Sequence, residues 1–336
     1  MKKLFNTRDR MPDDMIDGFI AAYPSLVARG QHPRVVRRAQ MTPGKVALVI
    51  GNGCGHEPIA MGFVGRGLLD ANVVGDVFAA PPPDMILQGL REVAGPEGTI
   101  LLISRHEGDV INGMAAAMLA GDEGLRVRSL WMYDDISSAP KGQEDDRRGA
   151  AGTIFVYKIL GAAAETGMAL EDLVALGAAV RDASRTLAAA VNPGISPLTG
   201  KPMFTLPADE IYIGMGVHGE PGVGRRKSGP VRDLVAFMLD ALLADRPIAP
   251  GTPVIAIVNG MGGCTMMELL TVYRDLAQGL DARGIPHRSP IIGSFSTTQE
   301  MAGFSMSLLT PTPQMLAFWQ APHAAPQFPV IQTGGA

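Results

Sequence analysis

Residues 46–58, VALVIGNGCGHEP, decide how this chain folds. The apolar run 46–50 is too short for a helix and stops at a glycine, which is typical of a buried strand. The loop that follows carries three alternate glycines before His56, and glycine lets the backbone approach a ligand closely with its N–H groups exposed. In open α/β sheets ligands bind beyond the carboxyl ends of strands, so this stretch predicts an α/β fold with a strand-end site.

The same pattern recurs through the first half of the chain. Apolar runs at 100–103 and 127–133 predict two more strands, and the segments 83–93 and 110–120 predict helices between them. Strand, polar loop and helix in repetition indicate βαβ units and a mostly parallel sheet.

A second α/β series follows two long helices. Those helices are predicted at 150–166 and 169–191, and Asn192-Pro193-Gly194 ends the second of them. We therefore expect two α/β domains, 1–192 and 193–336, each an open, mostly parallel or mixed sheet flanked by helices. The later elements expected are strands at 211–217, 254–258 and 291–295 and helices at 231–244 and 266–282.

Composition excludes several classes of protein. A chain of 336 residues with 46% hydrophobic and 18% charged residues is not disordered, and its net charge of −4 argues against a nucleic-acid partner. We find no signal peptide and no apolar run that approaches the roughly 18 residues needed to cross a membrane. Cys54 and Cys264 lack disulfide-framework or zinc-site spacing, which favours a reducing, cytoplasmic location and no metal in this chain.

The first glycine loop is not a dinucleotide fingerprint. Residues 51–55 read G-x-G-x-G, followed by a histidine and a proline, whereas a nicotinamide site needs G-x-G-x-x-G at the start of a helix. An oxidoreductase is therefore a distant alternative. His56 is either a capping or core histidine or part of the strand-end site.

A second strand-end loop, Ser104-Arg105-His106-Glu107-Gly108-Asp109, precedes a predicted helix. Asp109 is either the N-cap of that helix or a catalytic carboxylate. The charged residues before it are either a solvated cluster or part of the site.

The third loop, residues 214–222, is GMGVHGEPG. His218 beside glycine at a strand end suits a nucleophile or base that must reach a small ligand, and a simple turn is the alternative. The charged segment 225–227 is either surface or anion-steering, because Arg226 stands where a phosphate loop needs glycine. Cys264, for which no partner base is evident, is interpreted as a structural thiol.

At these loops the chain resembles the dihydroxyacetone-binding subunit of dihydroxyacetone kinases. The likeness runs in order from about residue 5 to residue 315, and seven segments in register make it specific. The matching segments are Gly55-His56-Glu57-Pro58, Gly62-Phe63-Val64-Gly65, Gly75-Asp76-Val77-Phe78-Ala79, Gly108-Asp109-Val110, Arg147-Arg148-Gly149-Ala150-Ala151-Gly152-Thr153, His218-Gly219-Glu220-Pro221-Gly222 and Met301-Ala302-Gly303-Phe304-Ser305.

The resemblance implies roles for three residues. It implies that His218 forms a covalent hemiaminal with a ketose carbonyl through Nε2, and that His56 and Asp109 hydrogen-bond the sugar hydroxyls and assist deprotonation of the terminal one. An imidazole must be neutral to attack a carbonyl. The further substrate-binding residues that the resemblance implies are Gly53, Cys54, Gly55, Phe78 and Ser104.

Two departures from the family pattern leave the sugar open. Residues 104–107 are Ser-Arg-His-Glu where the family commonly has Lys-Asn-Tyr-Thr, and residues 51–54 are Gly-Asn-Gly-Cys where it has three glycines and a serine. Dihydroxyacetone, a four-carbon ketose and a branched ketose all remain candidates.

The resemblance also implies partners. The family's nucleotide-binding domain, with its magnesium-binding carboxylates, has no counterpart in this sequence. We therefore expect no cofactor in this chain, and a separate subunit that supplies the phosphoryl group through ATP or through bound ADP in a phosphotransferase relay, with magnesium. The resemblance implies a homodimer as well. A coactivator that binds the ketose without catalysis is the alternative of a different class.

Overall fold

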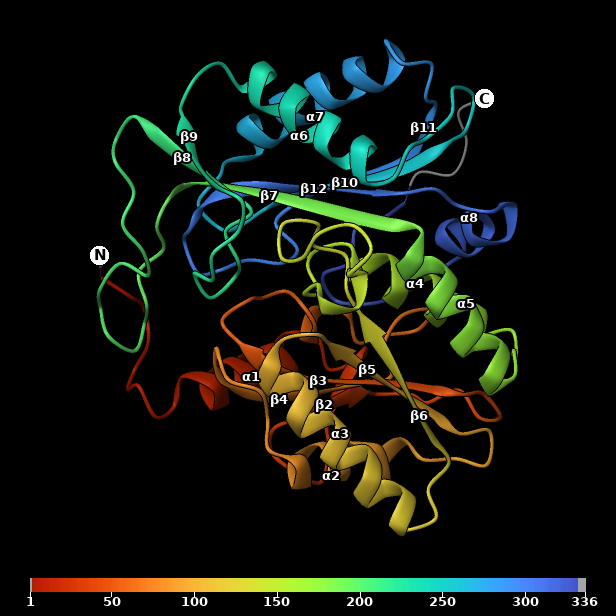
Figure 1. The fold of residues 1–336 in the computed structure, drawn as a ribbon. Coiled ribbons are helices and arrows are strands. Elements are labelled where there is room, and N and C mark those ends of the chain that lie inside the picture. The colour runs from red at the N-terminus through yellow and green to blue at the C-terminus, as the bar shows by residue number, and fades with distance from the viewer. Residues whose placement is uncertain (1, 332–336) are drawn as a thin grey trace. The chain divides into compact units, whose positions relative to one another are not determined.

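The computed structural model describes residues 2–331 and contains two six-stranded sheets flanked by helices (Figure 1). The helices are α1 (Met11–Ala22), α2 (Pro83–Val93), α3 (Glu107–Asp122), α4 (Thr153–Ala164), α5 (Leu170–Asp182), α6 (Val231–Asp245), α7 (Met266–Asp281) and α8 (Pro313–Gln320), with short 3-10 helices η1 (Met61–Phe63) and η2 (Glu144–Asp146). The strands are β1 (Val27–Arg29), β2 (Val35–Arg38), β3 (Ala47–Cys54), β4 (Ala71–Val77), β5 (Thr99–Ser104), β6 (Val127–Met132), β7 (Ser184–Asn192), β8 (Glu210–Ile213), β9 (Gly224–Lys227), β10 (Val254–Gly260), β11 (His287–Gly293) and β12 (Ala302–Leu309).

The chain forms two compact units, and it passes between them more than once. Unit 1 comprises Met1–Met132, Ile154–Val180 and Ala317–Phe328, and unit 2 comprises Tyr133–Thr153, Arg181–Leu316 and Pro329–Ala336. The boundary expected between residues 192 and 193 falls inside unit 2. Local sequence does not reveal that α4 and α5 pack with the N-terminal strands, because that choice is made by long-range burial of apolar surface.

Unit 1 contains the sheet that begins with the stretch quoted first. Its strand order is β1-β2-β4-β3-β5-β6, in which β3 pairs in parallel with both β4 and β5. Helix α2 packs on this sheet because Ile86, Leu87, Leu90 and Val93 share one buried face at helical spacing. As parallel neighbours, β4, β3 and β5 bring their carboxyl ends to the same edge.

Helices α4 and α5 also belong to unit 1. Gly177 of α5 lies so close to Leu130 of β6 and Leu160 of α4 that a side chain there would collide with them. The Ala-, Pro- and Gln-rich tail from Ala321 is expected from its composition to fray, but the structure corrects this. Ala324 pairs with Arg66 across an isolated bridge and Phe328 is buried, while the part of the tail at 332–336 lies outside the described residues.

Unit 2 contains a sheet of order β11-β10-β12-β7-β8-β9, in which β10 and β11 are parallel and the other neighbours are antiparallel. The helix expected over 169–191 is wrong in its second half, since α5 ends at Asp182 and β7 begins at Ser184. The alanines of β7 favour a helix locally, but burial between β12 and β8 outweighs that weak preference.

Helices α6 and α7 pack on one face of the unit 2 sheet. Leu234, Val235 and Leu239 of α6 and Leu269 and Leu276 of α7 join the same buried cluster as the strands. Helix α7 begins with a capping box, because Thr265 and Glu268 satisfy each other's backbone N–H groups. Within residues 2–331, the structure contains no helix with the length and apolarity required to cross a membrane.

Candidate active site

The carboxyl ends of β4, β3 and β5 collect the residues expected at the site in unit 1. His56 follows β3 by two residues, Phe78 follows β4 directly, and Ser104 is the last residue of β5. The rings of His56 and Phe78 face each other with centroids 5.1 Å apart. His56 is 7% exposed, so its imidazole is buried among the residues at this edge of the sheet.

Close contacts require the glycines at 53 and 55. Residues 51–54, expected in the loop after the strand, are part of β3, so Gly53 is a strand residue and Gly55 begins the loop. Gly55 has φ +101°, and a Cβ there would lie 2.6 Å from the ring of Phe78. A Cβ at Gly53 would lie 2.7 Å from the backbone nitrogen of Ala79. Phe78 itself has φ +60°, an uncommon conformation for a non-glycine residue, and its N–H donates to the carbonyl of Cys54 at 2.9 Å. The carboxyl ends of β3 and β4 are thus held against each other close to His56.

The electrostatics of this loop keep the Cys54 thiol protonated. Burial raises the pKa of Cys54 to about 12, and the nearby carboxyl of Glu57 adds to the effect. Burial also raises the pKa of Glu57, although the N–H of Gly55 donates to its Oε1 at 2.9 Å. Cys54 therefore lines the loop as a neutral thiol and not as a nucleophile.

The second loop places Asp109 in the first turn of α3. His106, and not Asp109, is the N-cap residue, so the capping interpretation of Asp109 does not hold. The carboxylate instead has Oδ2 3.8 Å from Nδ1 of His106, and that ring nitrogen lies 3.0 Å from Oγ of Ser104. Arg105 lies over the ring of Trp131, 5.9 Å from its centroid. A carboxylate here is favoured by the positive end of the helix dipole.

In unit 2, β8 ends at Ile213, so residues 214–217, expected as strand, form a turn that presents His218. The N–H of Gly214 donates to Ala188 of β7, and the N–H of Gly216 donates to the carbonyl of Glu220 at 2.9 Å. Gly219 closes the turn with φ +86°. These bonds hold the loop with its histidine 29% exposed.

His218 is paired with Glu220. Nδ1 of the imidazole lies 2.8 Å from Oε1 of Glu220, and the backbone N–H of His218 donates to Oε2 at 2.8 Å. Burial opposes ionisation of Glu220, but these hydrogen bonds and its electrostatic interaction with His218 outweigh it and hold the pKa of Glu220 well below its usual range. An ionised carboxylate at Nδ1 favours the tautomer that carries its proton there.

Arg148 supports this turn from another segment of unit 2. Its Nη2 donates to Oδ2 of Asp135 at 2.8 Å and to the carbonyl of Gly214 at 3.4 Å. A Cβ at Gly216 would overlap Oε2 of Glu220 and lie 2.6 Å from Nη1 of Arg148. Sequence reasoning from the residues assigned no role to Glu220 or Arg148, although both lie in the segments that carry the resemblance.

The structure bears on two interpretations made from the sequence. The charges of β9 have acidic neighbours: Nζ of Lys227 donates to Asp209 at 2.6 Å, and Arg225 lies 3.9 Å from Glu210. The guanidinium of Arg226 lies over the ring of Phe237, 4.3 Å from its centroid, and these contacts favour a charged strand edge over an anion site. Cys264 accepts a hydrogen bond from the N–H of Gly303 at 3.2 Å, and burial raises its pKa, so it is a neutral thiol.

The expected site residues are thus divided between the units. Unit 1 carries His56 and Asp109, together with Gly53, Cys54, Gly55, Phe78 and Ser104, at or beside strand ends. Unit 2 carries His218 on its glycine turn. The protein therefore belongs to the class of two-unit α/β proteins with strand-end sites for a small molecule. Its glycine-dense loops and the carboxylate-paired histidine that one of them presents are the evidence.

Comparison with known proteins identifies the family. The Dak1 domain profile matches residues 17–327, and the chain belongs to this family. A dihydroxyacetone-binding subunit, DhaK, of a PTS-dependent dihydroxyacetone kinase from Listeria innocua is 39% identical over 92% of this chain and 94% of its own length. A D-erythrulose kinase from Mycolicibacterium smegmatis is 36% identical over 98% of this chain and 56% of its own.

Solved structures agree with this assignment. The dihydroxyacetone kinase of C. freundii superposes with a TM-score of 0.88 at 31% identity, over 100% of this chain and 61% of that one. A dihydroxyacetone kinase operon co-activator, Dha-DhaQ, superposes with a TM-score of 0.89 at 30% identity, over 94% of this chain and 98% of that one. The expected α/β fold with two mixed sheets is confirmed.

Proposed function

We propose that this chain is the ketose-binding subunit of a dihydroxyacetone-type kinase, which holds a short ketose on His218 while a separate subunit supplies the phosphoryl group. The observation that carries the proposal is the His218–Glu220 pair on its glycine turn. The near full-length match to a dihydroxyacetone-binding subunit supports it, because the two chains cover more than nine tenths of each other.

The pairing gives His218 the tautomer that a nucleophile needs. With its proton on Nδ1 and directed at Glu220, the imidazole has its lone pair on Nε2. Nε2 attacks the keto carbon, the C–N bond forms, and the electrons of the C=O π bond move to oxygen. That oxygen takes up a proton from solvent, and the ring, which keeps its own proton on Nδ1, carries a positive charge that the Glu220 carboxylate stabilises.

A covalent bond of this kind selects ketoses. Glycerol offers the same terminal hydroxyls as dihydroxyacetone but has no carbonyl, and it cannot form the adduct. A site that depends on one bond which the competitor cannot form discriminates more strongly between substrates than a site that only adds contacts to the preferred one.

We assign the remaining chemistry to unit 1 and to the partner. His56 and Asp109 hydrogen-bond the sugar hydroxyls, and one of them accepts the proton of the terminal hydroxyl as it attacks phosphorus. Phosphoryl transfer depends mainly on positioning and on charge stabilisation, which the partner's bound nucleotide and magnesium supply.

Intact-protein mass spectrometry tests the adduct. We expect dihydroxyacetone to add its mass under gentle ionisation, glycerol to add nothing, and His218→Ala to lose the adduct. An adduct that persists in His218→Ala contradicts the assignment. Incubation with a nucleotide-binding subunit, phosphoryl donor and ketose then tests transfer, and absence of sugar phosphate with every cognate partner and short ketose refutes the kinase.

Two alternatives have specific support. The match to D-erythrulose kinase favours a four-carbon ketose, and a panel of ketoses in the adduct assay orders them by affinity. The similarity to the Dha-DhaQ co-activator favours a ketose sensor without catalysis. The sensor predicts adduct formation without phosphoryl transfer, so the two assays together separate it from the kinase.

A further inference from the structure

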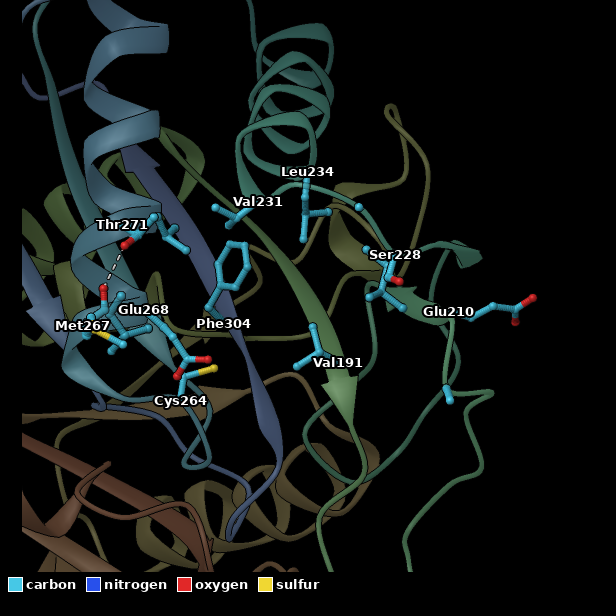
Figure 2. A pocket seen from close by; sticks show the side chains of 15 residues that line it. Val191, Glu210, Ser228, Val231, Leu234, Cys264, Met267, Glu268, Thr271 and Phe304 are labelled. Atoms are coloured by element: carbon cyan, nitrogen blue, oxygen red, sulfur yellow. Dashed lines mark hydrogen bonds between the residues drawn. The ribbon is translucent and has the colours of Figure 1, made fainter.

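Unit 2 contains a pocket of about 460 Å³ that the proposed function does not use (Figure 2). It lies on the face of the sheet that α6 and α7 cover, where both helices begin. Pockets of ~300–1,000 Å³ are the size that small organic ligands occupy. Its walls come from β7, β8, β12, α6, α7 and the loops beside them. The lining residues are Val191, Ala208, Glu210, Ile211, Ser228, Gly229, Val231, Leu234, Cys264, Met267, Glu268, Leu269, Thr271, Val272 and Phe304.

The walls of this pocket are mainly apolar. Leu269, Val272 and Phe304 belong to the buried core of unit 2, so the pocket reaches from the surface to that core. Figure 2 shows the ring of Phe304 standing between the side chains of α6 and those of α7. An apolar wall is unfavourable for a polyhydroxylated sugar, which would lose hydrogen bonds to water on entry.

Exposed methionines at the start of α7 adjoin the pocket. Met267, which lines it, is 76% exposed, and its neighbours Met266 and Leu270 are 52% and 51% exposed. Large apolar side chains grouped at the surface are unfavourable in water and mark binding surfaces. Methionine also adapts its shape to different ligands. The rim is therefore suited to closing over an apolar molecule.

The charged groups around the pocket further restrict the chemical class of ligand that it can bind. The lining residues include no lysine, arginine or histidine, and of their two carboxylates Glu210 is paired with Arg225 and Lys227, at 3.9 and 3.5 Å, so Glu268 carries the negative charge of the wall. The positive ends of α6 and α7 would attract an anion, but each already has an acidic residue in its first turn, Asp233 and Glu268. Figure 2 shows the carboxylate of Glu268 beside the Cys264 thiol, whereas Glu210 points away from the other labelled side chains.

From these observations we propose that the pocket binds an uncharged or cationic small molecule with an apolar body, and that it rejects an anion of the same shape. The ligand would contact Ile211 of β8, two residues before that strand ends and the His218 turn begins. The proposal does not depend on ketose binding or on phosphoryl transfer.

Cys264 provides a reporter for this pocket. The sequence has two cysteines, and Cys264 lines the pocket. Cys54 is 4% exposed and its pKa is raised to about 12, so it reacts slowly with maleimides in the folded protein. The rate at which N-ethylmaleimide adds to the full chain therefore measures access to Cys264, and peptide mass spectrometry identifies the labelled residue.

The experiment compares three probes that share one apolar body: cyclohexylmethanol, cyclohexylmethylamine and cyclohexanecarboxylate. At ten times its dissociation constant, we expect the alcohol or the amine to slow labelling of Cys264 about tenfold, with saturation, because only the unoccupied fraction reacts. The carboxylate leaves the rate unchanged. Glutathione labelled under the same conditions controls for effects on the reagent.

Thr271→Trp, which fills the pocket, should make labelling slow and insensitive to the probes. Gln278→Trp, exposed on the same helix away from the pocket, should behave as the parent chain does. A thermal melt confirms that each variant is folded. Equal protection by the carboxylate, no protection by the alcohol or amine, or a Cys264 that never reacts would each overturn the proposal. So would labelling that slows with protein concentration, because a second copy would then cover the rim.

Discussion

Replacement of Glu220 tests whether this carboxylate prepares His218 for attack on a carbonyl. Glu220 accepts two hydrogen bonds of 2.8 Å from one residue, from the ring and from the backbone of His218. In Glu220→Ala both are lost and the imidazole is free to take the other tautomer. The adduct, which needs the lone pair on Nε2, should then be weaker.

The size of the effect follows from the contacts. A hydrogen bond to a charged group contributes about 1.5–3 kcal/mol, and because both side chains are close to a third exposed, solvent screening reduces this to roughly 1–2 kcal/mol. At about 1.4 kcal/mol for each factor of ten, the dissociation constant of the ketose adduct should rise about 5- to 30-fold. Glu220→Gln keeps an acceptor oxygen for Nδ1–H, and it should lose only about threefold.

Titration with dihydroxyacetone, read by the adduct fraction in intact mass spectra, measures this constant. Glu171→Gln, on the surface of unit 1 and paired with Arg128, is the matched control and should match the parent chain. A thermal melt separates misfolding from a local effect. If folded Glu220→Ala binds the ketose within twofold of the parent chain, the positioning role is refuted, because there is then no loss of affinity for Glu220→Gln to recover.

Three further predictions each rest on a single contact or buried group. Gly216→Ala puts a Cβ against Oε2 of Glu220, so it should weaken the adduct as much as Glu220→Ala while the melting temperature stays near that of the parent chain. Gly55→Ala forces a side chain to φ +101° against Phe78, and urea denaturation should show a loss of at least ~1–2 kcal/mol. Burial lowers the pKa of Lys158 to about 8, below the ordinary 10.5, so the folded state binds this proton less tightly than the unfolded chain does. Its contribution to stability is therefore lowest below pH 8 and rises between pH 8 and 10.5 by up to roughly 3 kcal/mol, a slope that urea denaturation should find in the parent chain and not in Lys158→Met.

The elements with strong local patterns could be predicted from the sequence. The run 46–50 stops at a glycine and supplies residues 47–50 of β3, and α2 matches its predicted bounds of 83–93, because apolar spacing is a property of neighbouring residues. The strand-end positions of His56 and Ser104 follow from the same signals. The glycines at 53 and 55 are required by contacts with the 78–79 turn, which the sequence does not reveal.

Other features depend on partners distant in the chain. The alanines of β7 have a helical preference, and they form a strand because residues 302–309 and 210–213 supply its hydrogen-bonding neighbours. Composition alone predicts that the tail frays, yet Phe328 is buried in contact with the ring of Trp319. Neither the strand pairing of β7 nor the burial of Phe328 can be recognised from a pattern of neighbouring residues in the sequence.

The chain by itself determined the α/β class, the glycine-dense loops and the histidines that they carry, since these are encoded within about ten consecutive residues each. Only the tertiary structure decided that Arg148 supports the His218 turn, that Glu220 orients His218, and that a pocket remains between α6 and α7. Hydrogen bonds and cavities are set by atoms that meet after the chain has folded. Their energies depend on distances and burial that spacing along the sequence does not fix.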